Sequence, residues 1–371
     1  MSAGTSRHPP YQLRPNKAID RFLLVDLLRH LPLEERKQYE YIGMGGPFLE
    51  DFKIMHHYFP EMKLTSIESN LHTFKRQKFN RSFKDIKLVH KEIKQYFENF
   101  DGFRKPLVVW FDGTSFKKET IQIIHTILRK LPLNSIFKIT ARVSFDTEPH
   151  FEQFASDASE AIQIYLKQNS ALTKKKQSGM TNDISSILSR LAKQKDETIR
   201  LMQSLQDFLP EGYEELLYDL PSRAKLYFRV LQKVVESVYP RTGNTVFHLL
   251  SSHYYSDGTT MISLTGILVR RQEVQNIKKL FHSFKDQGDR LDGPVQIDSP
   301  ILSVKERMKL DPLLPMCATK SVGGRSKKTI GCRLRQELGY LIDNSKKTTE
   351  SKLEFYNSYQ QYSPFFSRVQ L

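Results

Sequence analysis

The chain has 371 residues, 39% of them hydrophobic, and a net charge of +16 with a pI near 9.6. Its length and composition predict two or three structural units with a substantial core. Its positive charge predicts an attraction for polyanions. It contains no apolar run of about 18 residues and no apolar N-terminal segment, so neither a membrane-spanning helix nor a secretory signal is expected. The two cysteines, Cys317 and Cys332, are too few for a disulfide framework or a cysteine zinc site, and they favour a reducing compartment, which predicts a cytoplasmic protein without a structural metal.

Five short runs rich in β-branched and aromatic residues are predicted to be strands. They are residues 39–42, 63–67, 86–90, 107–111 and 135–143. Stretches with apolar residues at helical spacing precede and separate them, at residues 17–31, 48–55, 71–80, 91–100 and 119–130. The run at 107–111 is apolar throughout, which is typical of a parallel strand buried on both faces. This alternation predicts a parallel sheet with helices on both faces.

The second half of the chain departs from this alternation. Residues 147–243 are polar and mainly helical, and they balance 13 basic against 13 acidic residues. Two β-rich runs follow, at 245–255 and 259–269, joined by a turn that contains Asp257 and Gly258. Because Asp-Gly between two such runs favours a tight turn, they are predicted to form a hairpin.

Three features fall at the carboxyl ends of the predicted parallel strands, where an open α/β sheet binds its ligands. A glycine turn follows the first strand, and glycine allows both a tight turn and the close approach of a ligand. Glu68 ends the second strand and can accept hydrogen bonds from both hydroxyls of a ribose, while Asp112 ends the fourth strand. Each feature alone is equally well explained as a turn, a solvated acid or a cap. Together, in this order, they favour a nucleotide-cofactor site.

The glycine turn differs from two common nucleotide-binding motifs. The dinucleotide pattern G-x-G-x-x-G would need a glycine where Phe48 stands, and no Walker A sequence is present. The chain instead resembles the class I S-adenosylmethionine-dependent methyltransferase superfamily, with residues 41–46 as the glycine motif, Glu68 as the ribose-binding acid and residues 110–114 as the strand-four motif. The resemblance implies S-adenosylmethionine as the cofactor, with His90 near the adenine. The implied cofactor-binding residues are Tyr41, Gly43, Gly45, Gly46, Glu68, His90 and Asp112.

The start of the first helix is a further candidate contact. In folds of this kind, the region can fold over the cofactor, so Asn16 and Lys17 are candidates to reach its carboxylate. The alternative is a plain helix N-terminus with Asn16 as the N-cap, which the residue type favours.

The hairpin is the most discriminating feature of the resemblance, which covers about residues 15–146 and 244–270. In this superfamily, strand seven inserts antiparallel between strands five and six. The implied fold is α/β, a seven-stranded, mostly parallel Rossmann-like sheet with an antiparallel C-terminal hairpin. The expected parts of the chain are a cofactor-binding core at 1–146, a helical insertion or cap at 147–243, the hairpin at 244–270, and a basic C-terminal region with a helical tail at 271–371.

The same residues leave two main functions open, beside a weaker third, a basic nucleic-acid binder without a small-molecule site. The first is a methyltransferase that acts on nucleic acid or a nucleotide-like substrate, with Asp112 orienting or deprotonating the acceptor. The chain is also similar to uncharacterised bacterial proteins classed as O-methyltransferases, some from anti-phage gene clusters, which implies a role in defence. The second is an inactive sensor of S-adenosylmethionine or a nucleotide, or a scaffold in a defence complex. Tyr41 and Pro47 favour the second, because the superfamily usually has an acid and a glycine there.

Two segments of the last hundred residues are predicted to contact partners. Residues 271–371 carry 18 basic and 11 acidic residues, and a glycine-containing loop among them can follow a phosphate backbone, although a solvated loop is an equal alternative. Its candidate nucleic-acid contacts are Lys320, Arg325, Lys327, Lys328, Arg333 and Arg335. The tail aromatics could stack on bases, but their near-helical spacing favours a core or a protein interface. They are Phe355, Tyr356, Tyr359, Tyr362, Phe365 and Phe366. The 147–243 insertion is a second candidate surface for a protein partner.

Overall fold

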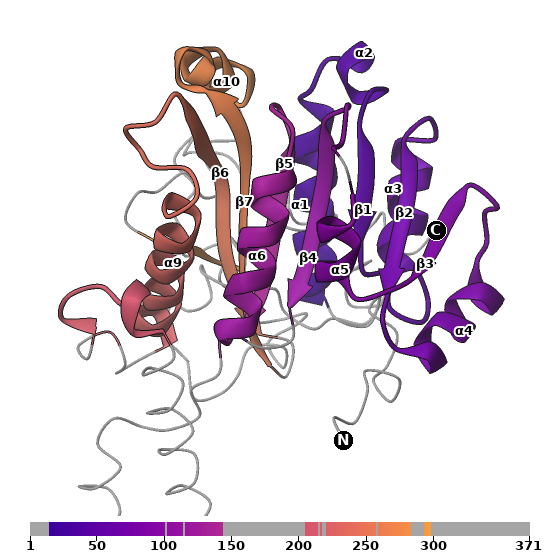
Figure 1. Ribbon diagram of the computed structural model, residues 1–371, viewed down its shortest axis with the longest axis horizontal. Helices are drawn as coiled ribbons and strands as arrows, with labels where there is room; N and C mark the ends of the chain where they lie inside the picture. Colours follow the sequence, from indigo (N-terminus) through magenta and orange to yellow (C-terminus); the bar gives the residue numbers. More distant parts are fainter. Residues whose placement is uncertain are drawn as a thin grey trace, which may run out of the picture.

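A computed structural model describes most of the α/β core and the hairpin (Figure 1). The described residues are 15–100, 102–113, 116–143, 205–213, 216, 220–256, 259–282 and 293–297. The predicted nucleic-acid loop at 320–335, the tail aromatics and most of the predicted 147–243 insertion lie outside these ranges.

One eight-stranded sheet organises the described chain, in the order β3-β2-β1-β4-β5-β7-β6-β8. Its strands are β1 (Glu40–Gly43), β2 (Lys63–Glu68), β3 (Ile86–His90), β4 (Leu107–Gly113), β5 (Ile136–Arg142), β6 (Thr245–Ser256), β7 (Thr260–Arg270) and β8 (Val295–Ile297). Strand β7 runs antiparallel to both β5 and β6, and the other pairs are parallel. The predicted Rossmann-like sheet with its inserted hairpin strand is therefore confirmed. The expected seven strands were one too few, because β8 has only three residues and no readable periodicity.

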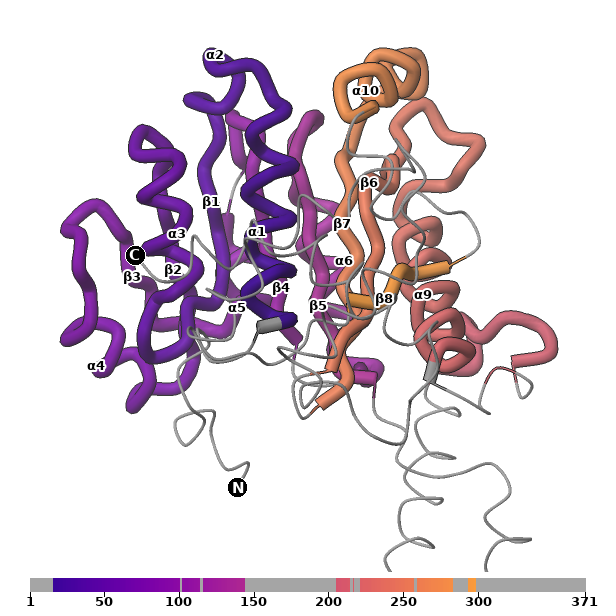
Figure 2. The backbone as a smooth tube through the Cα atoms, turned by 180° about the vertical axis from the view of Figure 1, so that it is seen from behind, coloured from indigo at the N-terminus to yellow at the C-terminus, as the bar shows by residue number. Residues whose placement is uncertain are grey.

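Helices cover both faces of this sheet (Figures 1 and 2). On one face, α1 (Pro15–Arg29) and α3 (Glu50–Tyr58) pack over the central strands, and on the other lie α5 (Ile93–Glu98), α6 (Lys118–Lys130) and α9 (Leu220–Glu236). The shorter helices are α2 (Leu33–Arg36), α4 (Leu71–Asn80) and α10 (Val274–Leu280), with 3₁₀ turns at Gln206–Phe208 and Arg271–Glu273. None of the helices in the described ranges is long and apolar enough to cross a bilayer.

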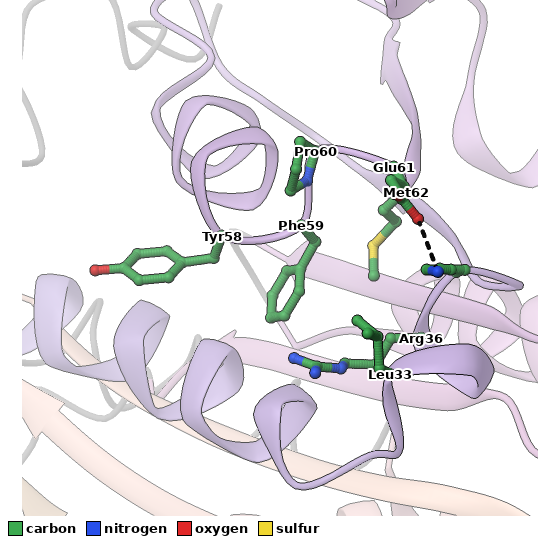
Figure 3. Close-up of a pocket in the computed structure, with 8 residues that line it drawn as sticks. Leu33, Arg36, Tyr58, Phe59, Pro60, Glu61 and Met62 are labelled. Atoms are coloured by element: carbon green, nitrogen blue, oxygen red, sulfur yellow. Dashed lines mark ion pairs between the residues drawn. The ribbon is translucent and has the colours of Figure 1, made fainter.

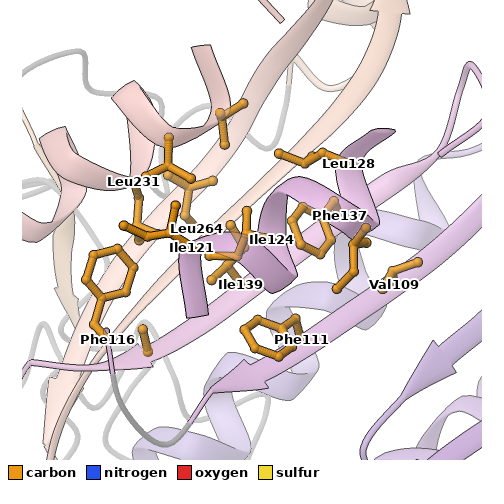
Figure 4. Close-up of a cluster of buried hydrophobic side chains, with 14 of the residues drawn as sticks. Val109, Phe111, Phe116, Ile121, Ile124, Leu128, Phe137, Ile139, Leu231 and Leu264 are labelled. Atoms are coloured by element: carbon orange, nitrogen blue, oxygen red, sulfur yellow. The ribbon is translucent and has the colours of Figure 1, made fainter. Parts of the chain in front are cut away.

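The core on the α6 side follows directly from the apolar pattern. Figure 4 shows Phe111 and Ile139 of the central strands beneath Ile124 of α6, with Leu231 of α9 beside them. Helix α9 falls inside the predicted 147–243 insertion, yet it buries Leu231 completely and packs against β6, β7 and α6. The end of that segment therefore contributes to the core, while the predicted division of the whole chain stays a prediction.

Helix α1 differs from the other core helices because charged side chains lie on its buried side. Lys17, Asp20 and Arg21 are all at most 7% exposed. Each of them forms an ion pair with a residue of a different element, namely β4, β5 and α3. Since a buried charge without a partner is costly, these pairs fix how α1 sits on the sheet.

Candidate functional site

The glycine turn begins where β1 ends, at the carboxyl edge of the sheet. Gly43 lies between Ser66 of β2 and Trp110 of β4. Gly46 has a φ of 52°, in the left-handed region that glycine adopts without strain. Leu49 also has a positive φ, 55°, and directly precedes α3. The turn thus reverses the chain tightly between β1 and α3.

Two of the glycines leave room for the protein's own side chains. A Cβ on Gly43 would lie 2.9 Å from the Tyr41 hydroxyl, and a Cβ on Gly45 would lie 2.5 Å from Leu49 and 2.8 Å from Phe52. Tyr41 is buried against Phe52, with ring centroids 5.1 Å apart, and burial raises the pKa of its hydroxyl well above the ordinary value. The side chain of Tyr41 therefore packs the inner side of the turn, and its predicted role in cofactor binding stays a prediction.

We expect Gly45→Ala to lower the free energy of unfolding by about 1–3 kcal/mol, because the added methyl overpacks Leu49 and Phe52. Urea denaturation measures the change. In a Phe52→Leu background the same substitution should cost less, since the smaller side chain can yield. An equal cost in both backgrounds would contradict this packing role.

Polar side chains from β2 and α4 hold the turn from outside. The Gly45 N–H donates to Ser66 Oγ at 3.4 Å, and Gln77 Nε2 donates to the Gly46 carbonyl at 2.9 Å. Asn80 Nδ2 donates to the Pro47 carbonyl at 2.8 Å. The sequence analysis missed these residues, although a glutamine on the buried side of a helix is a recognisable signal. They fix the shape of the turn without a ligand.

Glu68 and His90 lie side by side at the same edge, because they are register partners on β2 and β3. The Asn70 N–H donates to Glu68 Oε1 at 2.7 Å. Burial raises the pKa of Glu68, and the backbone N–H groups of Asn70 and Ser69 offset part of that effect. The His90 ring lies 2.9 Å from the Ser69 carbonyl through Nε2 and stacks on Phe74. A carboxylate and a stacked ring pair thus meet beside the glycine turn.

Asp112 is engaged by the start of α1. Lys17 Nζ donates to Asp112 Oδ2 at 2.6 Å, with the side chains 8% and 20% exposed. Asn16 lies inside α1, so it is not the helix N-cap; its side-chain amide donates to the Ser256 carbonyl at 3.0 Å. Asn16 therefore binds the end of β6, and Lys17 binds the end of β4. Lys17 also holds the carboxylate of Asp112 in a fixed orientation.

A second ion pair of α1 lies deeper and was not foreseen. Lys138 Nζ of β5 donates to Asp20 Oδ1 at 2.6 Å and to Ser263 Oγ at 2.7 Å, and it lies 4.9 Å from the centre of the Trp110 ring. The Tyr255 hydroxyl lies 3.4 Å from Asp20 Oδ2. A lysine within an apolar strand pattern gives little signal in sequence, because its partner is 118 residues away.

A third ion pair of α1 joins Arg21 to Asp51 of α3. It lies between α1 and the helix that follows the glycine turn. The three pairs therefore connect α1 to β4, to β5 and to α3, the elements that surround the candidate site.

A small pocket lies at the opposite edge of the sheet, between α2 and the loop that precedes β2 (Figure 3). Leu33, Arg36, Phe59 and Met62 line it, and its volume is about 130 Å³. That is well below the roughly 300–1,000 Å³ of ordinary ligand pockets. Since it adjoins the amino ends of β1 and β2, it is remote from the glycine turn and Glu68. Within the described part of the chain, no three His, Cys, Asp or Glu side chains are grouped as ligands of a metal ion.

The comparison with known families decides what kind of protein has this edge. A family model described as "Putative O-methyltransferase" matches residues 9–371. The chain belongs to that family. The resemblance to methyltransferases is thereby confirmed, and S-adenosylmethionine is the methyl donor that membership implies. No curated protein matches the chain in sequence.

Three solved structures that resemble this methyltransferase share little sequence with it. The plantazolicin methyltransferase BpumL in complex with SAH is 9% identical, with a TM-score of 0.33, over 68% of this chain and 85% of BpumL. A "putative caffeoyl-CoA O-methyltransferase from Staphylococcus aureus" is 11% identical, with a TM-score of 0.32, over 67% and 83%. "PigF with SAH" is 13% identical, with a TM-score of 0.25, over 34% of this chain and less than half, 43%, of its own. Since all three TM-scores are low, we argue function from the family and from the chain's own residues.

The carboxyl edge of this methyltransferase fits an adenosyl cofactor by the chemistry of its groups. Glu68 has a second carboxylate oxygen besides the Oε1 that Asn70 binds, and it is only half-buried. The stacked rings of Phe74 and His90 stand beside it. A carboxylate acceptor for ribose hydroxyls and an aromatic surface for a base therefore occur together, next to a turn held in place by Gln77.

Proposed function

We propose that this methyltransferase transfers the methyl group of S-adenosylmethionine to a hydroxyl oxygen of a nucleic acid or nucleotide-like acceptor, in the cytoplasm. One observation supports it above the others: the glycine turn, Glu68 and the Lys17–Asp112 pair share one edge of the sheet. The net charge of +16 supports a polyanionic acceptor. A defence role rests on the sequence resemblance, and a plaque assay comparing wild type with Glu68→Ala tests it.

The chain's own residues would divide the work as follows. The bound cofactor supplies an electrophilic methyl carbon. Glu68 would accept hydrogen bonds from the ribose hydroxyls, and His90 would border the adenine. Asp112 would accept the proton of the acceptor hydroxyl or orient it, with its carboxylate held by Lys17. Alignment of the acceptor oxygen with the methyl carbon is the main contribution expected of the protein.

Glu68→Gln should weaken S-adenosylmethionine binding by about tenfold to a hundredfold, because hydrogen bonds to a charged acceptor are worth about 1.5–3 kcal/mol. Calorimetry on the full chain measures the dissociation constant. Glu61→Gln, an exposed glutamate at the opposite edge, is the matched control and should leave the binding unchanged. No heat of binding for the wild-type chain would refute the proposed cofactor.

The same measurement has a pH dependence with a definite sign. Only the ionised Glu68 can accept from both ribose hydroxyls, so the affinity should fall as the pH falls through the pKa of Glu68. Because burial raises that pKa, the loss should begin at a higher pH than for an exposed glutamate. This part of the pH profile should be absent in Glu68→Gln.

A sensor without transfer activity is the second candidate function. It is favoured by Tyr41 and Pro47, which stand where the superfamily usually has an acid and a glycine. The two functions differ in one experiment, in which full-length protein is incubated with S-adenosylmethionine labelled in the methyl group and with total RNA or DNA. Cofactor binding without label transfer supports the sensor.

A further inference from the structure

The segment that forms the end of α4 and the outer strand β3 is strongly basic. Residues 75–91 contain seven lysines and arginines and one acid, Asp85, a net charge of +6 out of the +16 of the whole chain. Six of the seven are exposed: Lys75, Lys78, Arg81, Lys84, Lys87 and Lys91. Within the described ranges, none of these six has a carboxylate within 4.0 Å. No carboxylate of the described residues therefore neutralises this charge.

An aromatic side chain stands on this basic surface. Phe79 is 90% exposed, the highest value among the large hydrophobic residues described, and Leu71 is 52% exposed, the third highest after Leu33. Leu71, Lys75 and Phe79 are spaced four residues apart on α4, so they share one face of the helix. The opposite face packs Phe74 and Gln77 into the protein. The outward face of α4 thus combines cations with one nearly bare phenyl ring.

This surface adjoins the candidate cofactor site. Arg76 lies 4.9 Å from the centre of the Phe48 ring, just after the glycine turn, and Gln77 and Asn80 bind the turn's carbonyls. His90 ends β3 beside Glu68. Figure 1 shows α4 and β3 at the outer end of the sheet, opposite α9 and β6. A ligand bound along α4 would therefore lie beside the ribose and adenine end of the proposed cofactor site.

We propose that α4 and β3 form a binding surface for single-stranded nucleic acid, with Phe79 stacking on an unpaired base and the exposed lysines contacting phosphates. Aromatic stacking together with a cationic track is the usual means of holding single strands. A duplex would offer no base face to Phe79. Edge lysines such as Lys87 also prevent strand pairing, but that role does not explain an exposed phenylalanine. The proposal deepens the proposed function and rests on it for the acceptor, although binding can be tested without transfer.

Other polyanionic partners fit the surface less well. An anionic membrane would need a broad apolar helix face, and the apolar side of α4 is turned inward through Phe74. An acidic protein would use the lysines but would leave Phe79 without a specific role. Both remain distinguishable outcomes of the experiment.

The test measures the binding of fluorescein-labelled 20-nucleotide single strands of RNA and of DNA to the full chain by anisotropy at several salt concentrations. Phe79→Ala should weaken binding about tenfold, whereas Leu33→Ala, an exposed apolar residue on α2, should not. Lys75→Gln combined with Lys87→Gln should reduce the slope of log affinity against log salt by about 1.4, because each lost phosphate contact lowers the slope by about 0.7 on a single strand. The matched pair Lys278→Gln and Lys279→Gln on α10 should leave the slope unchanged.

Three outcomes would overturn the proposal. The first is an unchanged affinity of Phe79→Ala for single strands, and the second is an equal salt slope in the two double-lysine variants. The third is a wild-type chain that binds no single strands but does bind phosphatidylserine vesicles or an acidic peptide, with that binding lost in these variants. Thermal melting should show that all variants remain folded, as expected for exposed sites. Strand binding and transfer of the labelled methyl group, measured on the same protein, separate the two proposals. Strand binding without label transfer supports this surface and counts against the enzyme, and transfer to another acceptor without strand binding does the reverse.

Discussion

Lys138→Met should lower the free energy of unfolding by about 3–5 kcal/mol. The side chain of Lys138 is 2% exposed and that of Asp20 is fully buried, so removal of the cation leaves a carboxylate without its counter-ion inside the protein. Domains of this kind are stable by about 5–15 kcal/mol, so the variant would lose a large fraction of its stability. Urea denaturation, read by tryptophan fluorescence, measures the change through Trp110, whose ring lies beside the lysine.

Two further variants make this expectation specific to the buried pair. Lys138→Met together with Asp20→Leu should recover most of the loss, because replacing both charges of a buried pair by apolar groups is often neutral or stabilising. Lys37→Met removes a lysine that pairs with Glu34 on the surface, and it should leave the stability nearly unchanged, because exposed ion pairs contribute little. A double variant as unstable as Lys138→Met would show that the cost arises from packing and not from the unpaired charge.

Asp112→Asn should reduce the rate of methyl transfer by about 10²–10⁴-fold while leaving S-adenosylmethionine binding little changed. The asparagine keeps the shape of the side chain and its contact with Lys17, but it cannot accept a proton. Single-turnover transfer of labelled methyl to RNA gives the rate, and calorimetry gives the cofactor affinity. Full transfer activity in Asp112→Asn would show that the carboxylate has no part in the reaction.

Lys17→Met separates orientation from proton transfer. Asp112 would remain in place without the 2.6 Å contact that fixes it, so we expect a smaller loss of rate than in Asp112→Asn. Glu34→Gln, a surface carboxylate of α2, is the control for the removal of a charge, and it should leave the rate as in wild type. A loss in Lys17→Met as large as that in Asp112→Asn would instead place the lysine in the reaction itself.

The parallel strands and the hairpin could be predicted from local patterns, whereas the place of β7 between β5 and β6 was implied by the family resemblance. Residues 107–111 of β4 are apolar throughout, which predicted a strand buried on both faces, and the two long runs on either side of Asp257 and Gly258 pair as a hairpin. The sequence predicted Glu68 at the end of a strand, and in the structure it is the last residue of β2. Three-residue β8 and the core role of α9 could not be predicted, because the first is too short for periodicity and the second is defined by what it packs against.

The sequence by itself determined the class of fold, the glycine turn and the acids at the strand ends, since these depend on local periodicity and on residue type. Only the tertiary structure decided what those residues contact. It assigned Gly43 and Gly45 to make room for Tyr41, Leu49 and Phe52, and it paired Lys17 with Asp112. The physical reason is that packing and ion pairs join residues far apart in the chain, and a local pattern does not encode such partners.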